Sequence, residues 1–123
     1  MGVEQMQWLP EATEAEFQAA KALLRRYKYM NRALIGLRQM DTLTLKQECA
    51  LREYADKTAN IELAISLIID PEVRDITDHV FLQGNNRQTA IHKLRWHTER
   101  TVDRRIRRGV ISVANTLKDW GII

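Results

Sequence analysis

Arginine is the residue type that dominates one short stretch of this chain. Between residues 87 and 108, eight basic side chains stand with only two acids, Glu99 and Asp103, although the whole 123-residue chain has a net charge of only +3. The guanidinium group donates in a planar fork that matches a phosphate or the O6 and N7 atoms of guanine. So high a density of one charge sign indicates a polyanionic partner, and nucleic acid is the most common one.

Helical periodicity divides the residues after Thr98 into two faces. Thr98 is a favourable N-cap, and the apolar pattern that follows it ends near Trp120 and Gly121. At about 100° per residue, one narrow sector of this helix holds Val102, Ile106, Gly109 and Val113. The opposite sector, about 100° wide, holds Arg100, Arg104, Arg107 and Arg108. The pattern therefore predicts one buried edge and one guanidinium face.

A shorter helix precedes this one and completes a recognisable motif. A helix of about two turns from Arg87 to Leu94, a turn over residues 95–97 and the helix after Thr98 together predict a helix-turn-helix. The second helix of this motif enters the major groove of double-stranded DNA, so we expect Arg100 and Arg104 to contact bases. Thr98 is expected to donate to a phosphate, and Thr101 belongs to the same interface. The residues expected to neutralise phosphates are Arg87, Arg95, Arg105, Arg107 and Arg108.

Apolar residues spaced by three and four predict two long helices before this motif. Capping-box patterns start at Thr13 and Thr44, and a third helix is expected to begin at Asp70–Pro71 and end at Gly84. The expected inward residues are Ala20, Leu23, Tyr27, Met30, Leu34 and Leu37 in the first helix, and Leu51, Tyr54, Thr58, Ile61, Ile65 and Ile68 in the second. The predicted fold class is all-α, with a helical hairpin over residues 1–69 and a tri-helical DNA-binding module over residues 70–123.

The same stripes leave the oligomeric state open. Both fit a heptad with apolar a and d positions, so an intermolecular coiled coil is an alternative to the intramolecular hairpin. We expect a homodimer on two half-sites, because one module of this size binds DNA modestly. Ile111 widens the apolar arc of the last helix beyond Gly109, which calls for a second surface from the hairpin or from another subunit.

Several other classes of protein do not fit the composition. One cysteine, Cys49, excludes an internal disulfide and fits a reducing cytoplasm, and no apolar run reaches the ~18 residues that span a bilayer. His79, His92 and His97 lack the paired spacing of a zinc site, so we expect these histidines to be solvated or to face a phosphate. Cys49 is expected to be a small packing residue. Without a nucleophile elbow or phosphate loop, we expect no enzyme, cofactor, metal or small-molecule substrate.

Four segments resemble a known family. Residues 61–65 (IELAI), 74–76 (RDI), 81–84 (FLQG) and 98–106 (TERTVDRRI) are similar to the ArpU/RinA type of small phage-encoded transcriptional activators, whose C-terminal part is similar to region 4 of bacterial sigma factors. The resemblance covers residues 61–118 and implies an activator of late genes that binds a phage promoter. The turn at residues 94–98 is one residue longer than in the family pattern and lacks its glycine.

Two other functions remain open. A small terminase subunit also pairs a helix-turn-helix with oligomerising helices, although its DNA-binding unit usually comes first in the chain. A sigma-like adaptor would instead bind RNA polymerase without touching DNA. For the adaptor, Arg104→Ala is expected to leave activity intact.

Overall fold

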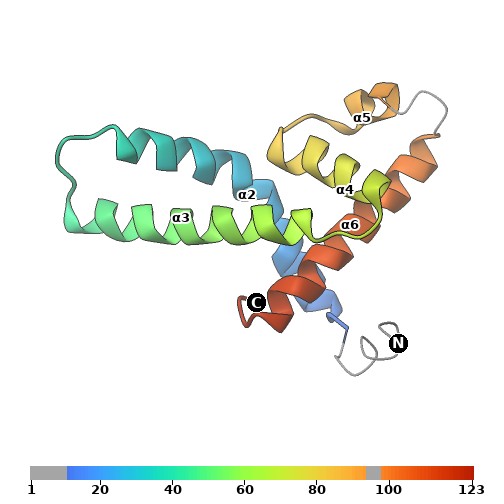
Figure 1. The fold of residues 1–123 in the computed structure, drawn as a ribbon, viewed down its shortest axis with the longest axis horizontal. Helices are drawn as coiled ribbons and strands as arrows, with labels where there is room; N and C mark the ends of the chain where they lie inside the picture. Colours follow the sequence, from blue (N-terminus) through green and yellow to red (C-terminus); the bar gives the residue numbers. More distant parts are fainter. Residues whose placement is uncertain (1–10, 94–97) are drawn as a thin grey trace.

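The computed structural model describes residues 11–93 and 98–123, except for the side chains of Arg87, His92 and Lys93. All regular elements in these ranges are helical, which confirms the all-α prediction. In chain order they are α2 (Glu14–Arg38), α3 (Leu45–Ser66), α4 (Pro71–Thr77), η1 (Asp78–Leu82), α5 (Arg87–Lys93) and α6 (Glu99–Asp119) (Figure 1). No helix in the described ranges is long and apolar enough to cross a membrane.

The helix starts lie where the sequence predicts them. Thr13 and Thr44 each form a complete capping box with the residue three positions on, Glu16 and Gln47. Asp70 accepts hydrogen bonds from the first-turn backbone of α4, ahead of Pro71. Each of these side chains satisfies a backbone N–H that the helix itself leaves without a partner. Local chemistry therefore determines where α2, α3 and α4 begin.

The two long helices α2 and α3 lie side by side and run in opposite directions, joined by residues 39–44 (Figure 1). Their facing stripes are close to the predicted ones, with Tyr27 and Met30 buried in α2 and Ile61 and Ile65 buried in α3. The prediction for α2 is wrong in detail. The residues buried in α2 are Phe17, Ala20, Leu24, Tyr27, Met30 and Leu34, whereas Leu23 and Leu37 are only partly buried.

Helix α6 supplies the reason for that difference. It crosses the α2–α3 pair near the N-terminal end of α2 and contacts both helices, so α2 buries a face toward α6 as well as one toward α3 (Figure 1). Val110, Val113 and Leu117 join the same core cluster as Leu24 and Ile61. The α2–α3 pair is thus the second surface that the apolar arc of α6 called for. A division of the chain between residues 69 and 70 stays a prediction.

Polar contacts tie the end of α6 to the start of α2. The backbone N–H of Ala12 donates to Oδ1 of Asn115 at 2.9 Å. Nζ of Lys118 lies 3.0 Å from Oε1 of Glu16 and 3.1 Å from the carbonyl oxygen of Glu11. These contacts join residues more than 100 positions apart, so the two ends of the described chain hold each other in place.

The segment from Pro71 to Leu82 is helical as predicted, but its second half has the wider turn of a π-helix, Asp78–Leu82. Gly84 follows with a positive φ of 73°, the conformation expected of a helix-terminating glycine. The predicted solvated or phosphate-facing role is wrong for His79, which is 6% exposed in this segment. The extra residue in a π-turn changes which side chains face the core, and three-and-four periodicity does not foresee it.

Cys49 also differs from expectation. It is exposed on α3 and is not a packing residue, because this turn of α3 lies near the end of the α2–α3 pair that projects away from α6 (Figure 1). Among the described residues, no group of three or more His, Cys, Asp or Glu side chains is placed to hold a metal ion.

Candidate nucleic-acid interface

The exposed face of α6 carries the predicted arginines. Val102, Gly109 and Val113 are buried on one side of the helix, whereas Arg100, Arg104, Arg107 and Arg108 are all exposed. Ile106 is partly buried against the core. The division into a buried edge and a guanidinium face is therefore present in the structure, because the core side of α6 packs on α2, α3 and α4.

Arg100 and Arg104 are the least engaged cations on this face. Neither pairs with an acidic side chain anywhere in residues 11–93 and 98–123, and both side chains are exposed. A guanidinium that is already solvated and unpaired needs no intramolecular contact broken before it binds an anion. These two positions, in the first two turns of α6, are therefore the best placed to engage a phosphate or a base edge.

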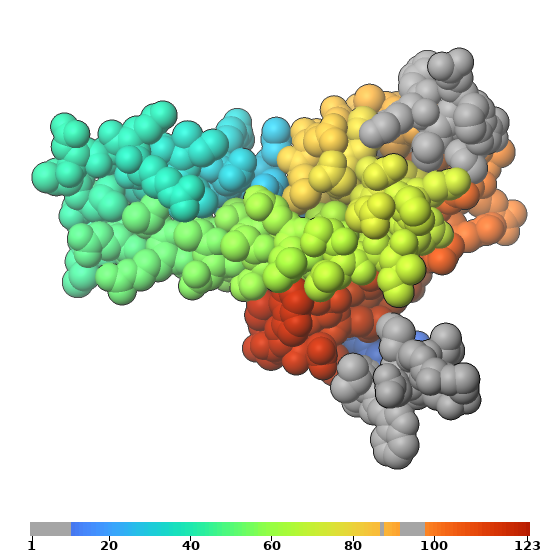
Figure 2. Space-filling model, viewed as in Figure 1, coloured from blue at the N-terminus to red at the C-terminus, as the bar shows by residue number. Residues whose placement is uncertain are grey.

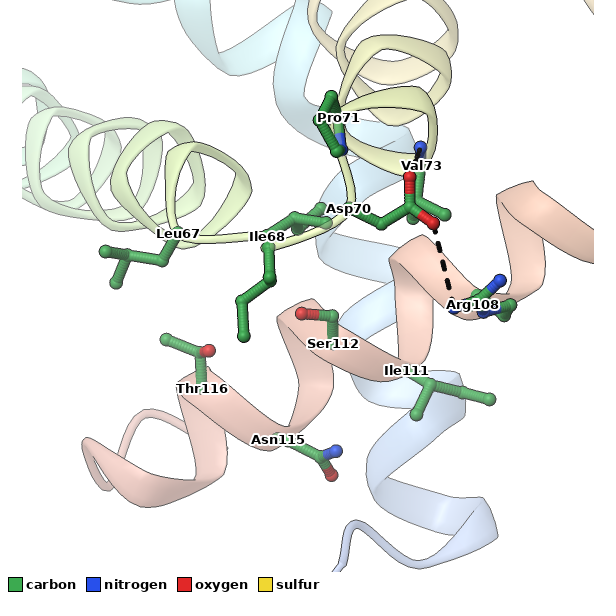
Figure 3. Close-up of a pocket in the computed structure, with 11 residues that line it drawn as sticks. Leu67, Ile68, Asp70, Pro71, Val73, Arg108, Ile111, Ser112, Asn115 and Thr116 are labelled. Carbon is green, nitrogen blue, oxygen red and sulfur yellow. Dashed lines mark hydrogen bonds and ion pairs between the residues drawn. The ribbon is translucent and has the colours of Figure 1, made fainter. Parts of the chain in front are cut away.

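Arg107 and Arg108 lie on the two flanks of the face. The Arg107 guanidinium stacks over the ring of Phe17 in α2, 4.7 Å from its centroid. Arg108 points toward Asp70 in the α3–α4 connection, with 3.9 Å between nitrogen and oxygen, and its side chain keeps 59% exposure (Figure 3). Both contacts leave the guanidinium accessible, so they orient the side chain without neutralising it fully.

Arg105 is different from the other four. It turns away from the exposed face toward α4, where it forms an ion pair with Glu72 and retains 21% exposure of its side chain. Its position about 100° around the helix from Arg104 accounts for this direction. Arg105 therefore serves first to join α6 to α4, and its predicted contact with phosphate would require that ion pair to open.

Two threonines organise the N-terminus of α6. Thr98 is the N-cap, as predicted, and its Oγ1 accepts from the backbone N–H of Thr101 at 3.2 Å. The two hydroxyl oxygens lie 3.0 Å apart and share a hydrogen bond. This pair leaves Thr98 exposed at the same end of the helix as Arg100.

The remaining predicted residues belong to the segment before α6. Arg87 is the first residue of α5, a helix capped by Asn86, whose Oδ1 accepts from the backbone N–H of Thr89 at 2.9 Å. Ala90 is buried, as expected for the inward face of this helix. Arg95 lies outside the described residues, and so do His97, Leu94 and the rest of the predicted turn.

Sequence reasoning missed a second group of cations next to this face. Lys21, Arg25 and Lys28 of α2 line an open groove whose other wall includes Asp103 and Ile106 of α6. The signal was present in the sequence, because the segment between Glu16 and Asp41 contains six basic residues and no acid. Residues 1–70 as a whole hold nine basic and ten acidic side chains, so the net charge of that range does not reveal these cations.

A second, more apolar groove lies on the other flank of α6. It runs between the α3–α4 connection and α6, with Leu67, Ile68 and Pro71 on one side and Ser112 and Thr116 on the other (Figure 3). Ile111 also lines this groove, which is why it is only partly buried.

Comparisons of the sequence with models of protein families, with curated proteins and with solved structures found no match in any of the three. A function for this chain is therefore inferred from the geometry and charge of its own residues.

Proposed function

We propose that this chain is a transcriptional regulator that binds double-stranded DNA through the exposed arginine face of α6. In this proposal α5 and α6 act as a helix-turn-helix, with α6 in the major groove. The observation that carries it is the set of four exposed arginines opposite the buried edge of α6. An ordinary solvated face would mix charges of both signs, whereas this face holds four cations of one kind.

The roles within the face follow from what each arginine already contacts. Arg100 and Arg104, exposed and without an acidic partner among the described residues, are proposed to reach base edges. Arg107 and Arg108, held at the flanks by Phe17 and Asp70, are proposed to contact phosphates on either side of the groove. In protein–DNA complexes, base contacts specify the sequence and phosphate contacts position the protein, and the proposed roles follow this pattern.

Thr98 supports the same geometry, because an exposed hydroxyl at a helix N-terminus lies where a phosphate is stabilised by the helix dipole. Arg87 and Arg95 remain proposed phosphate contacts from the preceding segment. Arg105 is left out of the proposed interface, since its guanidinium is engaged with Glu72.

The experiment is a binding titration of a fluorescein-labelled DNA duplex of mixed sequence, followed by anisotropy over a series of potassium chloride concentrations. The wild-type affinity is expected to fall with a log–log slope of about −3 or steeper, because each neutralised phosphate contributes roughly −0.9. A slope near zero would refute the proposal.

Paired substitutions then locate the surface. Arg100→Ala with Arg104→Ala is expected to weaken binding to this mixed-sequence duplex at least tenfold, because two cations are removed from the surface that meets the polyanion. The matched control is Arg38→Ala with Arg52→Ala, which removes the same charge from exposed positions at the end of α2 and in the N-terminal half of α3. The joined ends of these two helices form the part of the molecule that projects away from α6 (Figure 2). Equal losses in the two pairs would mean that binding follows total charge and not α6. Unchanged binding in the α6 pair would refute α6 as the DNA-contacting surface, whereas a wild type that does not bind the duplex at all would favour the adaptor that contacts polymerase without DNA.

A further inference from the structure

Helix α2 carries a cationic surface that the arginine face of α6 does not include. We propose that Lys21, Arg25 and Lys28 form a second phosphate-contacting surface, which holds the sugar-phosphate backbone of the same DNA duplex beside α6. This inference rests on the DNA binding proposed above, and it adds a second DNA-contacting surface, on α2, to the one on α6.

The spacing of the three residues suits one strand of a duplex. They stand at positions i, i+4 and i+7, so they share one side of α2 within about 60° and span roughly 10 Å along its axis. Successive phosphates of one DNA strand advance about 3.4 Å along the duplex axis, so this length matches about three of them. Arg32, one turn further on, is exposed and extends the same stripe.

Contacts place the stripe next to the arginine face of α6. Nζ of Lys21 lies 6.0 Å from the centroid of the Phe17 ring, the same ring over which Arg107 stacks. The ring of Phe17 therefore lies near one cation from α2 and one from α6. At the other end, the stem of Lys28 packs against Gly84, where an added Cβ would lie 2.8 Å from Cε of the lysine.

The charge of the groove between the two helices also favours an anionic occupant. Lys21, Arg25 and Lys28 line one wall, and Asp103 is the one acidic side chain among its described lining residues. No acidic side chain in residues 11–93 and 98–123 forms an ion pair with any of the three cations. A net positive groove along α6 is suited to the polyanionic backbone of DNA.

The test repeats the salt titration with the triple variant Lys21→Gln, Arg25→Gln, Lys28→Gln and the same mixed-sequence duplex. The slope is expected to become shallower by about 2.7, and the affinity at moderate salt to fall at least tenfold, because three counterion-releasing contacts are lost. The control triple is Arg38→Gln, Lys46→Gln, Arg52→Gln. It removes the same charge from exposed positions at the far end of the α2–α3 pair and is expected to change the slope by less than one contact's worth.

A single charge reversal at an exposed position keeps the proposal testable if the triple variant does not fold. Arg25→Glu is expected to weaken binding at least fivefold, with Arg52→Glu as its partner control and circular dichroism melts as the test of folding. If the wild type binds with a steep slope and the α2 variants keep it, the second surface is refuted while the function proposed for α6 stands. If the wild type itself shows no salt-dependent binding, the proposed function fails first.

Discussion

Gly109 lies midway along α6, where α4 packs against this helix, and it offers a direct test of how closely the two helices approach. A Cβ built at Gly109 would lie 1.9 Å from Oγ1 of Thr77 and 3.1 Å from its Cβ. Thr77 has no exposed surface, and its hydroxyl donates to the carbonyl oxygen of Val73 at 2.7 Å. The threonine therefore cannot move aside without breaking a buried hydrogen bond.

The substitution Gly109→Ala sets two effects against each other. Alanine in a helix interior is favoured over glycine by about 1 kcal/mol. Relief of the contact with Thr77 requires α4 and α6 to separate, and overpacking of a buried site costs roughly 1–3 kcal/mol. The added Cβ and Oγ1 of Thr77 are each within two bonds of the helix backbone, so neither can turn aside, and we expect a cost in the upper part of that range. The net expectation is a loss of about 2 kcal/mol in the free energy of unfolding.

Urea unfolding followed by far-UV circular dichroism measures this loss. Gly36→Ala is the matched control, because Gly36 lies within α2 and an added Cβ there meets nothing within 4 Å. That variant is expected to be more stable than wild type by about 0.5–1 kcal/mol.

A double-mutant cycle then isolates the contact. In a Thr77→Ala background the Oγ1 clash is absent, so Gly109→Ala is expected to cost at least about 1 kcal/mol less than it does alone. If Gly109→Ala stabilises the chain as Gly36→Ala does, or costs the same in both backgrounds, the close approach of α4 and α6 is refuted.

Two predictions concern titratable groups. The backbone N–H of Thr13 and the Lys118 ammonium hold the pKa of Glu16 below its usual 4.5, so the associated stability is present above that pH and is lost as the pH falls through the lowered pKa. Glu16→Gln should flatten the acid limb of a plot of urea midpoint against pH, and an unchanged limb would contradict this. Burial, followed by the hydrogen bond that its hydroxyl donates to Glu62, raises the pKa of Tyr27 above its usual 10.0. Stability is therefore lost as the pH rises above 10, because the unfolded chain releases this proton first. Tyr27→Phe should remove that loss and should lower the free energy of unfolding at neutral pH by about 1 kcal/mol. Because Tyr27 stays protonated while the chain is folded, the same variant should leave the phenolate absorbance of the folded chain unchanged.

Features governed by nearest neighbours along the chain could be predicted from the sequence. The caps at Thr13, Thr44, Asp70 and Thr98 each satisfy backbone groups within three residues, so the sequence pattern contains all the necessary information. The glycine after the third helix, Gly84, belongs to the same class, since its positive φ follows from local geometry.

Features that depend on a distant partner could not be predicted in this way. Leu24 is buried in place of Leu23 because α6 covers a second side of α2. His79 is buried on η1, where Nδ2 of Asn85 lies 3.2 Å from its Nδ1 and where α2 and α5 contact the same segment. The exposed arginines of α6 followed from periodicity alone, whereas the engagement of Arg105 with Glu72 depends on how α4 packs.

The contact between α2 and α6, two helices far apart in the sequence, has a consequence for folding during synthesis. The core around Leu24 is completed by Val110, Val113 and Leu117, residues translated more than 80 positions later. At about 5–20 residues per second, the ribosome takes several seconds to deliver them. During that interval the nascent α2–α3 pair has an uncovered apolar side, and Phe17 lacks the guanidinium of Arg107 above its ring. The same helix that presents the arginines is therefore the last piece to close the core, so a chain that has not finished folding has no assembled arginine surface to offer.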